Sequence, residues 1–340
     1  MRNNNIDSYR AFSFFLVFFY HAGYIEAGYI GVDLFFILSG YLMTGSIIAI
    51  NRIEGRKGIV LFLNKRISRL LPSILVVTIL TVICAYLIIP DTDRPEVIRT
   101  LIMTLVAGTN YYLALSQDYF GVGAMFNPFT HMWSISAEIH FYITFAILGF
   151  IFRFNNIITI VFIGLLIGIN LIFSSGSSES YLFSHTRIFS FIAGYFLYFV
   201  NLRIQLKFKY TTISKYILYS IIIISSFIRY PLVFVDTDWL LNSLIANILG
   251  CCLLLIILQS DSVTNVELSK VKKTITNIWT YLGRISYSLY LFHFPIMSFT
   301  LWIWGEVNLH NLIIIFIASF TMAALNYQFV ETRYANLRKK

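Results

Sequence analysis

The chain alternates between long apolar runs and short polar linkers from one end to the other. The runs are roughly twenty residues long, the length at which an α-helix crosses the hydrocarbon core of a bilayer. Eleven candidate spans share this character: 8–25, 31–50, 68–89, 97–115, 131–152, 156–174, 185–201, 213–230, 240–258, 281–303 and 310–330. The pattern predicts an all-α, polytopic membrane protein.

The linkers between these runs predict how the spans are oriented, because cytoplasmic loops carry an excess of Lys and Arg. That excess is found in three linkers and at the C-terminal end: 51–69, 201–215, 259–280 and 338–340. These segments should lie in the cytoplasm, together with both termini. Three other linkers lack the excess and should lie outside: 90–96, 175–184 and 231–239.

The run at 97–115 does not fit this orientation if it crosses the membrane. Its interior Gly108-Thr-Asn110 is weakly apolar, so we predict that the segment is re-entrant or lies in the interface. Leaving it out gives about ten transmembrane helices with both termini inside. Residues 1–340 should form a single membrane-embedded domain, since the loops are short and no internal repeat is visible.

Composition narrows the class of protein further. Only 12% of the 340 residues are charged and 58% are hydrophobic, against about 25% charged in soluble domains. A net charge of +9 would suggest nucleic acid in a soluble protein, but here it lies between spans and sets their orientation. No nucleic-acid partner is expected. The cysteines Cys84, Cys251 and Cys252 lie within apolar runs, which argues against disulfides and against a metal site.

Ionisable side chains inside the first two spans are the first functional candidates. Arg10 and His21 are eleven positions apart, so on a helix they share one face, within about 20° and about 16 Å along the axis. Because the second span descends from outside, Asp33 should lie at a height similar to that of His21. A carboxylate near an imidazole raises its basicity and fixes its tautomer, as a general base requires. The alternative is a His that only packs against a hydrogen-bonded neighbour.

A second polar face follows at the start of the span at 131–152. His131 and Glu138 are seven positions apart, and Tyr142 extends the same face by one turn. A buried carboxylate here would need a partner, for which Arg10 or a His is suited. The alternative is a structural ladder of polar residues between helices.

The span at 281–303 carries a third polar face. Ser286, Tyr290 and His293 share a face through i, i+4 and i+7 spacing, and Pro295 follows directly. The alternative here is packing without a chemical role.

The basic segment Lys65-Arg66-Ile-Ser-Arg69 begins the third span on its cytoplasmic side. It is either a positive-inside anchor or an anion site, since Arg66 and Arg69 share a helical face and suit phosphate groups. Basic groups inside and His and acidic groups in the outer half would suit a long ligand with an anionic head, such as an acyl-coenzyme A. The same depths would also suit a proton relay in a transporter.

Five ordered motifs carry a resemblance to a known family: Asp7-x-x-Arg10 followed by His21; Gly31-Val-Asp33-Leu-Phe35-Phe36-x-x-Ser39-Gly40; Lys65-Arg66-x-x-Arg69-Leu-Leu-Pro72; Asn127-Pro-x-x-His131-x-Trp133-Ser134-x-Ser136-x-Glu138-x-x-Phe-Tyr142; and Gly283-x-x-Ser286-Tyr287-Ser-Leu-Tyr290-Leu-x-His293-x-Pro295. With them the chain resembles the integral membrane acyltransferases of family 3, the O-antigen acetylase-like group. The match covers most of the chain.

The resemblance implies a ten-helix bundle in the bacterial cytoplasmic (inner) membrane. It would move an acyl group, usually acetyl, from cytoplasmic acetyl-coenzyme A to a hydroxyl of an envelope or secreted glycan. It makes His21 the principal catalytic residue and Arg10 its motif partner, and it assigns Lys65, Arg66 and Arg69 to the coenzyme. Without the additional extracytoplasmic domain of some members, the chain would need a partner protein or a lipid-linked acceptor.

The reaction that we predict is O-acyl transfer to a carbohydrate hydroxyl. His21, polarised by Asp33 or Glu138, would remove the hydroxyl proton during attack on the thioester carbonyl. Arg10 or Ser39 would stabilise the oxyanion. Supporting or substrate-binding roles go to the other motif residues: Asp7, His131, Trp133, Ser134, Tyr142, Ser286, Tyr290 and His293. The alternative function is a proton-coupled transporter or flippase of lipid-linked saccharides.

Overall fold

The computed structural model is helical throughout the parts of the chain that it describes. These parts are residues 4–116, 122–154, 156–173, 181–204, 208–227, 238–259 and 270–337, and no β-strand occurs in them. The all-α prediction is therefore confirmed for these residues. Most of the linkers at 175–184 and 231–239, part of 201–215 and 259–280, and the basic residues 338–340 lie outside the described ranges.

The chain divides into two compact units, which are described separately. The first comprises Met1–Leu42, Ser190–Phe234 and Asp238–Tyr287, and the second comprises Met43–Phe189, Val235–Thr237 and Ser288–Lys340. Three helices continue from one unit into the other: α2 (Ile30–Glu54), α8 (Ser184–Arg203) and α12 (Ser286–Trp304).

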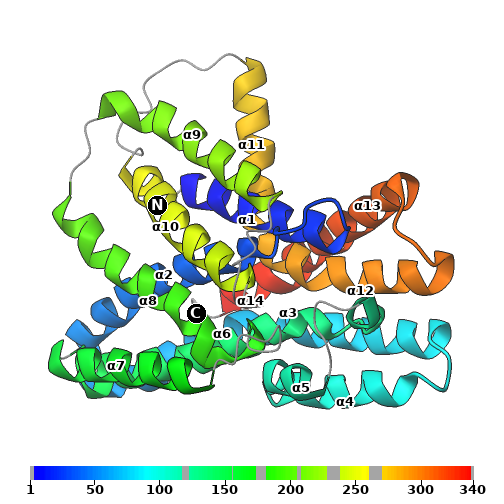
Figure 1. The fold of residues 1–340 in the computed structure, drawn as a ribbon, viewed down its shortest axis with the longest axis horizontal. Helices are drawn as coiled ribbons and strands as arrows, with labels where there is room; N and C mark the ends of the chain where they lie inside the picture. Colours follow the sequence, from blue (N-terminus) through cyan, green and yellow to red (C-terminus); the bar gives the residue numbers. More distant parts are fainter. Residues whose placement is uncertain are drawn as a thin grey trace. The chain divides into compact units, whose positions relative to one another are not determined.

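In the first unit, α1 (Asn4–His21) packs against α11 (Lys270–Arg284) and α10 (Asp238–Gln259), and α10 pairs with α9 (Phe208–Ser226). Figure 1 shows α9 and α10 running side by side. An aromatic pair joins α1 and α11, where Phe15 stacks on Trp279 with 5.3 Å between ring centroids.

Glycines set the close approach of α2 and α8 within the same unit. A Cβ on Gly194 would overlap the carbonyl oxygen of Ile37, and a Cβ on Gly40 would overlap the carbonyl oxygen of Phe191. Small residues at such crossings let two helix backbones come into contact, which is how helices associate without a hydrophobic driving force in lipid. The Gly40 of the second sequence motif is therefore a packing position.

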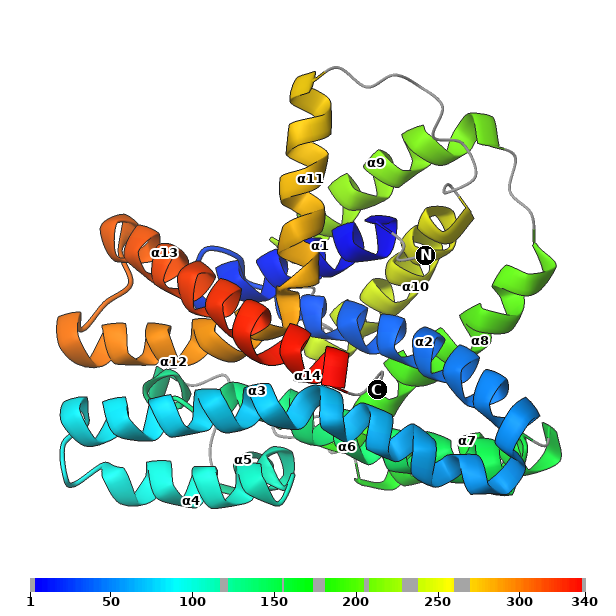
Figure 2. The same cartoon turned by 180° about the vertical axis from the view of Figure 1, so that it is seen from behind.

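The second unit contains α3 (Gly58–Ile88), α4 (Arg94–Leu105), α5 (Thr109–Ser116), α6 (Trp133–Ala146), α7 (Asn156–Phe173), α13 (Leu309–Asn326) and α14 (Thr332–Leu337). Short 3-10 or π turns join them at Gly55–Lys57, Val122–Phe126, Thr130–Met132, Ile147–Ile151 and Tyr327–Glu331. The long helix α3 is central, because it contacts α4, α6 and α14. Figure 2 shows α3 and α4 as neighbours.

The segment 97–115 is broken in the middle, as its weak interior predicts. The break lies at Ala107, whose φ of 55° is in the left-handed region, and it separates α4 from α5. These helices of 12 and 8 residues are about 18 Å and about 12 Å long, so neither spans a hydrocarbon core of about 30 Å alone. The segment is not a single transmembrane helix.

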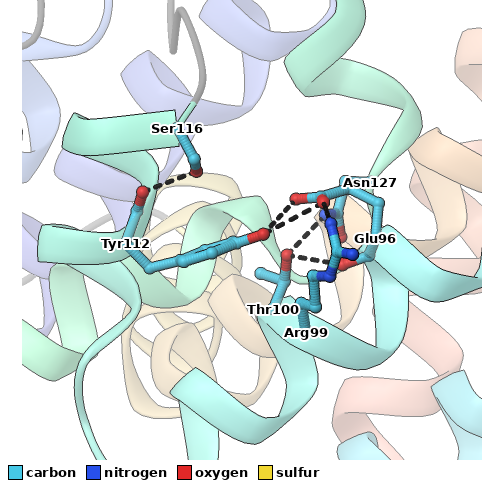
Figure 3. A network of polar contacts seen from close by, with 6 residues as sticks. All are labelled: Glu96, Arg99, Thr100, Tyr112, Ser116 and Asn127. Atoms are coloured by element: carbon cyan, nitrogen blue, oxygen red, sulfur yellow. Dashed lines mark hydrogen bonds and ion pairs between the residues drawn. The ribbon is translucent and has the colours of Figure 1, made fainter.

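A polar network holds α4 and α5 together (Figure 3). The Tyr112 hydroxyl donates to both carboxylate oxygens of Glu96, at 2.8 and 3.0 Å, and Arg99 lies 3.6 Å from the same carboxylate. Burial raises the pKa of the Tyr112 phenol and the hydrogen bond to Glu96 acts in the same direction. The phenol therefore stays protonated and serves as a donor.

Two predicted boundaries are wrong. The basic linker 259–280 contains a helix, α11, which begins at Lys270 and ends at Arg284, so the last part of that linker is not a loop. Its apolar residues recur every three or four positions between polar ones, which makes a window of average hydropathy miss it. Helix α3 begins at Gly58, ten residues before the apolar run that starts at 68, and the basic segment of residues 65–69 is helical, as the shared face of Arg66 and Arg69 predicts.

Three helical stretches of the described residues are long and apolar enough to cross a membrane: Ile30–Ile88, Thr130–Ile151 and Leu309–Tyr334. The first of them contains both α2 and α3, which are separated by Gly55, with a φ of +54°. The structure thus supports a membrane protein, while the number of about ten spans stays a prediction.

Replacement of Gly194 by Ala should destabilise the protein by about 1–3 kcal/mol, because the new methyl group meets the α2 backbone. Gly164→Ala is the matched control, since a Cβ on Gly164 has open space around it and Ala favours a helix. The thermal unfolding midpoints of both variants in detergent check this. Equal midpoints would show that the α2–α8 contact is not tight.

Candidate active site

His21 is the last residue of α1 and is buried, with 7% of its surface exposed. The loop that follows it is tied to the end of α9, where the Ala27 N–H donates to the Ser226 carbonyl at 2.8 Å. Because α1 is unbroken from Asn4 to His21, Arg10 lies on the same face as His21, about 16 Å away along the axis. The structure keeps the predicted relation of these two side chains.

Asp33 is fully buried in the first turn of α2, and the Ser190 hydroxyl donates to its Oδ1 at 2.7 Å. The sequence predicted that Asp33 lies at the height of His21, and this prediction is wrong. The contact between Gly31 and the carbonyl oxygen of Ser13 places the start of α2 beside the middle of α1 (Figure 2). Ser13 precedes His21 by eight residues, about 12 Å along α1. Asp33 follows Gly31 by two residues on α2, which runs away from the His21 end of α1.

The two predicted oxyanion donors are also far from His21 along the helices. Arg10 is separated from it by three turns of α1, and the half-buried Ser39 lies eight residues beyond Gly31 on α2. Because α2 runs from the Gly31 contact toward the N-terminal end of α1, Ser39 lies further from His21 than Gly31 does. Neither residue fits the oxyanion role as predicted.

Asp7 is buried and joins two arginines. Its Oδ1 lies 3.7 Å from Nη1 of Arg10, and its Oδ2 lies 3.6 Å from Nε of Arg284 at the end of α11. Sequence reasoning placed Asp7 in the first motif but missed Arg284. The signal was present, since Arg284 follows the first residue of the late motif, Gly283, directly.

In the second unit, the Glu138–Tyr142 part of the predicted face is formed on α6, whereas His131 lies in the 3-10 turn Thr130–Met132 before this helix. The Tyr142 hydroxyl donates to Oε1 of Glu138 at 2.7 Å, one helical turn away. The Arg66 guanidinium carbon lies 5.5 Å from the centre of the Tyr142 ring and 5.3 Å from that of Phe62, which are cation–π distances. Helix α3 thus brings Arg66, which is half-buried, to this face of α6, while its neighbours Lys65 and Arg69 are exposed.

His131 and His293 meet in a second buried cluster of this unit. Both imidazoles are fully buried and their ring centroids are 5.9 Å apart. The Tyr290 and Ser134 hydroxyls are 2.6 Å apart, and both lie within hydrogen-bonding distance of the His131 carbonyl. The Nδ1 of His293 lies 2.7 Å from the Tyr290 carbonyl, so this nitrogen carries the proton and Nε2 is the basic one.

The remaining predicted residues have packing positions. Trp133 is fully buried, with its ring 5.1 Å from that of Tyr181, and Ser286 is buried at the start of α12. Asn127 fixes the turn that leads into His131. Its amide donates to the Thr100 hydroxyl at 2.7 Å (Figure 3). Its Oδ1 accepts from the Phe129 N–H at 3.1 Å.

A further polar cluster was not predicted. Asn326 donates to the hydroxyls of Ser288 at 2.7 Å and Ser73 at 3.0 Å, and Ser288 in turn donates to Glu331. Ser73, Ser288 and the nearby pair Asn326 and Glu331 come from three stretches of the chain, so no local spacing reveals the whole cluster. Within the described residues, no group of three or more His, Cys, Asp or Glu side chains could hold a metal ion.

Comparison with known proteins assigns the family. The sequence model of the acyltransferase domain family matches residues 3–327. The chain belongs to this family. It is 31% identical to O-acetyltransferase OatA of Staphylococcus aureus (strain NCTC 8325 / PS 47) over 361 aligned positions, which cover 98% of this chain and 57% of OatA.

A second family relative comes from S. aureus strain COL, and its name gives O-acetyltransferase as a provisional designation. It is 27% identical over 97% of this chain and 56% of its own length. The chain thus spans little more than half the length of the curated relatives that it matches. No solved structure matches.

The coupling between Ser134 and Tyr290 can be measured with a double-mutant cycle. We expect Ser134→Ala and Tyr290→Phe to show a coupling free energy of about 0.6–1.7 kcal/mol, the range of hydrogen bonds between membrane helices. The measurement is reversible denaturation of the single and double variants in mixed micelles. Ser134→Ala with Tyr334→Phe, an exposed tyrosine of α14, is the control pair and should show no coupling.

Proposed function

We propose that this chain is a membrane O-acyltransferase that moves an acyl group, in this proposal acetyl, from cytoplasmic acyl-coenzyme A to a carbohydrate hydroxyl. The observation that carries the proposal is the match of the acyltransferase domain family to residues 3–327. It is supported by the O-acetyltransferase names of the relatives and by a buried imidazole, His21, on the same helix face as Arg10. Family membership favours this function over the transporter or flippase considered above.

His21 has the role of general base in this proposal. Its imidazole accepts the proton of the acceptor hydroxyl while the hydroxyl oxygen attacks the thioester carbonyl carbon. The carbon–sulfur bond then breaks, and the imidazolium returns the proton to the departing thiolate, so coenzyme A leaves as the thiol. Burial suits this role because the imidazole is shielded from bulk water. The support of His21 by the Glu138 carboxylate stays a prediction.

Arg66 and Arg69 bind phosphate groups of the coenzyme in this proposal, with Lys65 beside them. What supports it is that Arg66 lies at cation–π distance from both the Phe62 and Tyr142 rings, which limits its rotamers, while Arg69 is exposed one turn further on α3. A planar guanidinium in a fixed position is suited to bidentate recognition of phosphate.

The acceptor in this proposal is a hydroxyl of a lipid-linked or extracytoplasmic glycan of the cell envelope. The protein would lie in the bacterial inner membrane with about ten spans and both termini in the cytoplasm. A partner protein could complete transfer on the outer side. A reconstitution assay with labelled acetyl-coenzyme A and isolated envelope glycan tests the reaction and the acceptor together.

His21→Ala should lower acetyl transfer by about 10²–10⁴-fold, because removal of a general base costs this much. The measurement is label transfer by purified protein that elutes as a single species. His310→Ala, which removes an exposed His of α13, is the matched control and should retain activity. Full activity of the His21 variant would rule out the base role.

Arg69→Ala should raise the KM for acetyl-coenzyme A more than it lowers kcat, because it removes a contact to a part of the donor that does not react. Arg56→Ala removes another exposed arginine, from the preceding linker, and controls for the loss of one positive charge. Steady-state kinetics with varied donor measure the difference. An unchanged KM would make Arg69 a membrane anchor only.

A further inference from the structure

A serine and a histidine of the second unit are in contact, although neither was predicted as a site residue from the sequence. The Oγ of Ser184 lies 2.8 Å from Nδ1 of His140, which is a hydrogen-bond distance. Ser184 is the first residue of α8, and His140 lies in the middle of α6. A hydroxyl in contact with an imidazole is the arrangement that activates a serine for attack on a carbonyl carbon. Whether this pair can act in that way depends on which atom donates the proton.

Asn110 determines the direction of the hydrogen bond on the serine side. Its amide nitrogen donates to Ser184 Oγ at 2.9 Å and to the Leu182 carbonyl at 3.3 Å. Because a carbonyl can only accept, the nitrogen of the amide and not its oxygen faces these two groups. Ser184 therefore accepts from Asn110, and its own hydroxyl proton is left for His140.

The backbone determines the direction on the histidine side. The His140 ring also makes a hydrogen-bond contact with the backbone of Ala107, whose carbonyl is the acceptor. Since Nδ1 faces Ser184, the other nitrogen, Nε2, carries the ring proton, and Nδ1 is the basic atom. Ala107 has a φ of 55°, a backbone conformation that is uncommon for residues other than glycine and that occurs preferentially at functional sites.

The surroundings of the pair suit a polar ligand. Asn110 is fully buried, and its Oδ1 has no hydrogen-bond partner among the described residues. A buried acceptor of this kind costs free energy unless a donor reaches it, and the hydroxyl group of a bound alcohol is such a donor. His140 is half-buried, and the ring of the exposed Tyr111 lies 5.7 Å from its ring, so the imidazole lies at the edge of the core.

We propose that Ser184 is the nucleophile of a second acyl-transfer centre, with His140 as its general base and Asn110 as a positioning residue. Its substrate class is the acetyl ester of an alcohol. The linker 175–184 is predicted to lie outside, on the side of the proposed glycan acceptor and away from cytoplasmic coenzyme A. In this choice of substrate the inference rests on the proposed function, whose product is an acetylated hydroxyl.

Both half-reactions balance without a further reactant. In the first, Ser184 Oγ attacks the ester carbonyl carbon while His140 Nδ1 takes the hydroxyl proton. The bond between that carbon and the donor alcohol oxygen breaks, and the imidazolium gives its proton to the departing oxygen. In the second, another hydroxyl attacks the seryl ester and gives its proton to His140, which returns it to Ser184 Oγ. The acetyl group thus moves from one hydroxyl to another, or to water in simple hydrolysis.

The test uses p-nitrophenyl acetate, an acetyl ester that contains no coenzyme A, with the full chain purified in detergent. We expect the peptide that contains Ser184 to gain the mass of one acetyl group. Neutral hydroxylamine should not remove this group, as it would remove one from an imidazole or a thiol. Ser184→Ala should lose the label. Ser116→Ala, which removes an exposed serine of α5, is the matched control and should keep it.

A second variant separates a general base from a mere link between helices. The side chain of His140→Asn can still accept from Ser184, but it has no basic nitrogen. If His140 is the base, this variant should acetylate Ser184 about 10²–10⁴-fold more slowly while its thermal midpoint stays that of the wild type. His310→Asn, at an exposed position of α13, is the control and should keep the wild-type rate. A wild-type rate in His140→Asn overturns the inference.

Failure of this inference and failure of the proposed function give different results. If labelled acetyl-coenzyme A acetylates the glycan but p-nitrophenyl acetate leaves Ser184 unlabelled in the wild type, the inference is overturned and the proposed function stands. If acetyl-coenzyme A is not used but Ser184 is acetylated in a way that requires His140, the centre stands and the proposed function fails. Should the variants not fold, the wild type alone decides: label on Ser184 and on no exposed serine supports the centre, and any other pattern overturns it.

Discussion

Polar side chains on apolar helices must find their partners inside the protein, because the hydrocarbon core offers no water. The arrangement of this chain follows from that constraint. Asp33 accepts from Ser190, Glu138 accepts from Tyr142, and Asn326 donates to Ser73 and Ser288. The bonds of Asp33 and Asn326 join different helices and so restrict the rotation of each helix about its axis, whereas the bond between Glu138 and Tyr142 lies within α6.

Close helix contacts make these pairs possible. Gly31 and Gly283 let α2 and α11 touch the backbone of α1, and the two contacts lie near the middle and near the start of that helix. Helix α1 is therefore held at two levels, with His21 beyond the upper contact and Asp7 at the lower one. The first sequence motif thus includes residues at both levels, about 21 Å apart along one helix.

Residue spacing was a good guide wherever the relevant contacts lie within one helix. The faces shared by Arg10 and His21, by Glu138 and Tyr142, and by Tyr290 and His293 follow from the helical period, and the structure contains the continuous helices that this reasoning needs. The same local logic located the weak point of 97–115. The hydropathy pattern, by contrast, did not reveal α11, because an amphipathic helix rich in Lys and Thr has too low an average hydropathy to be distinguished from a basic linker.

The sequence by itself determined the helical class, most of the apolar spans, the family motifs and which residues share a face, because these depend on short-range periodicity and on the cost of placing charge in lipid. Only the tertiary structure decided that Asp33 lies beside the middle of α1 and not at His21, that Arg66 lies over Tyr142, and that Arg284 joins Asp7. These facts depend on the axial offset between packed helices, that is, on which turn of one helix lies beside which turn of the next. The offset is set by glycine contacts and side-chain shapes at residues far apart in the chain, which no local pattern records.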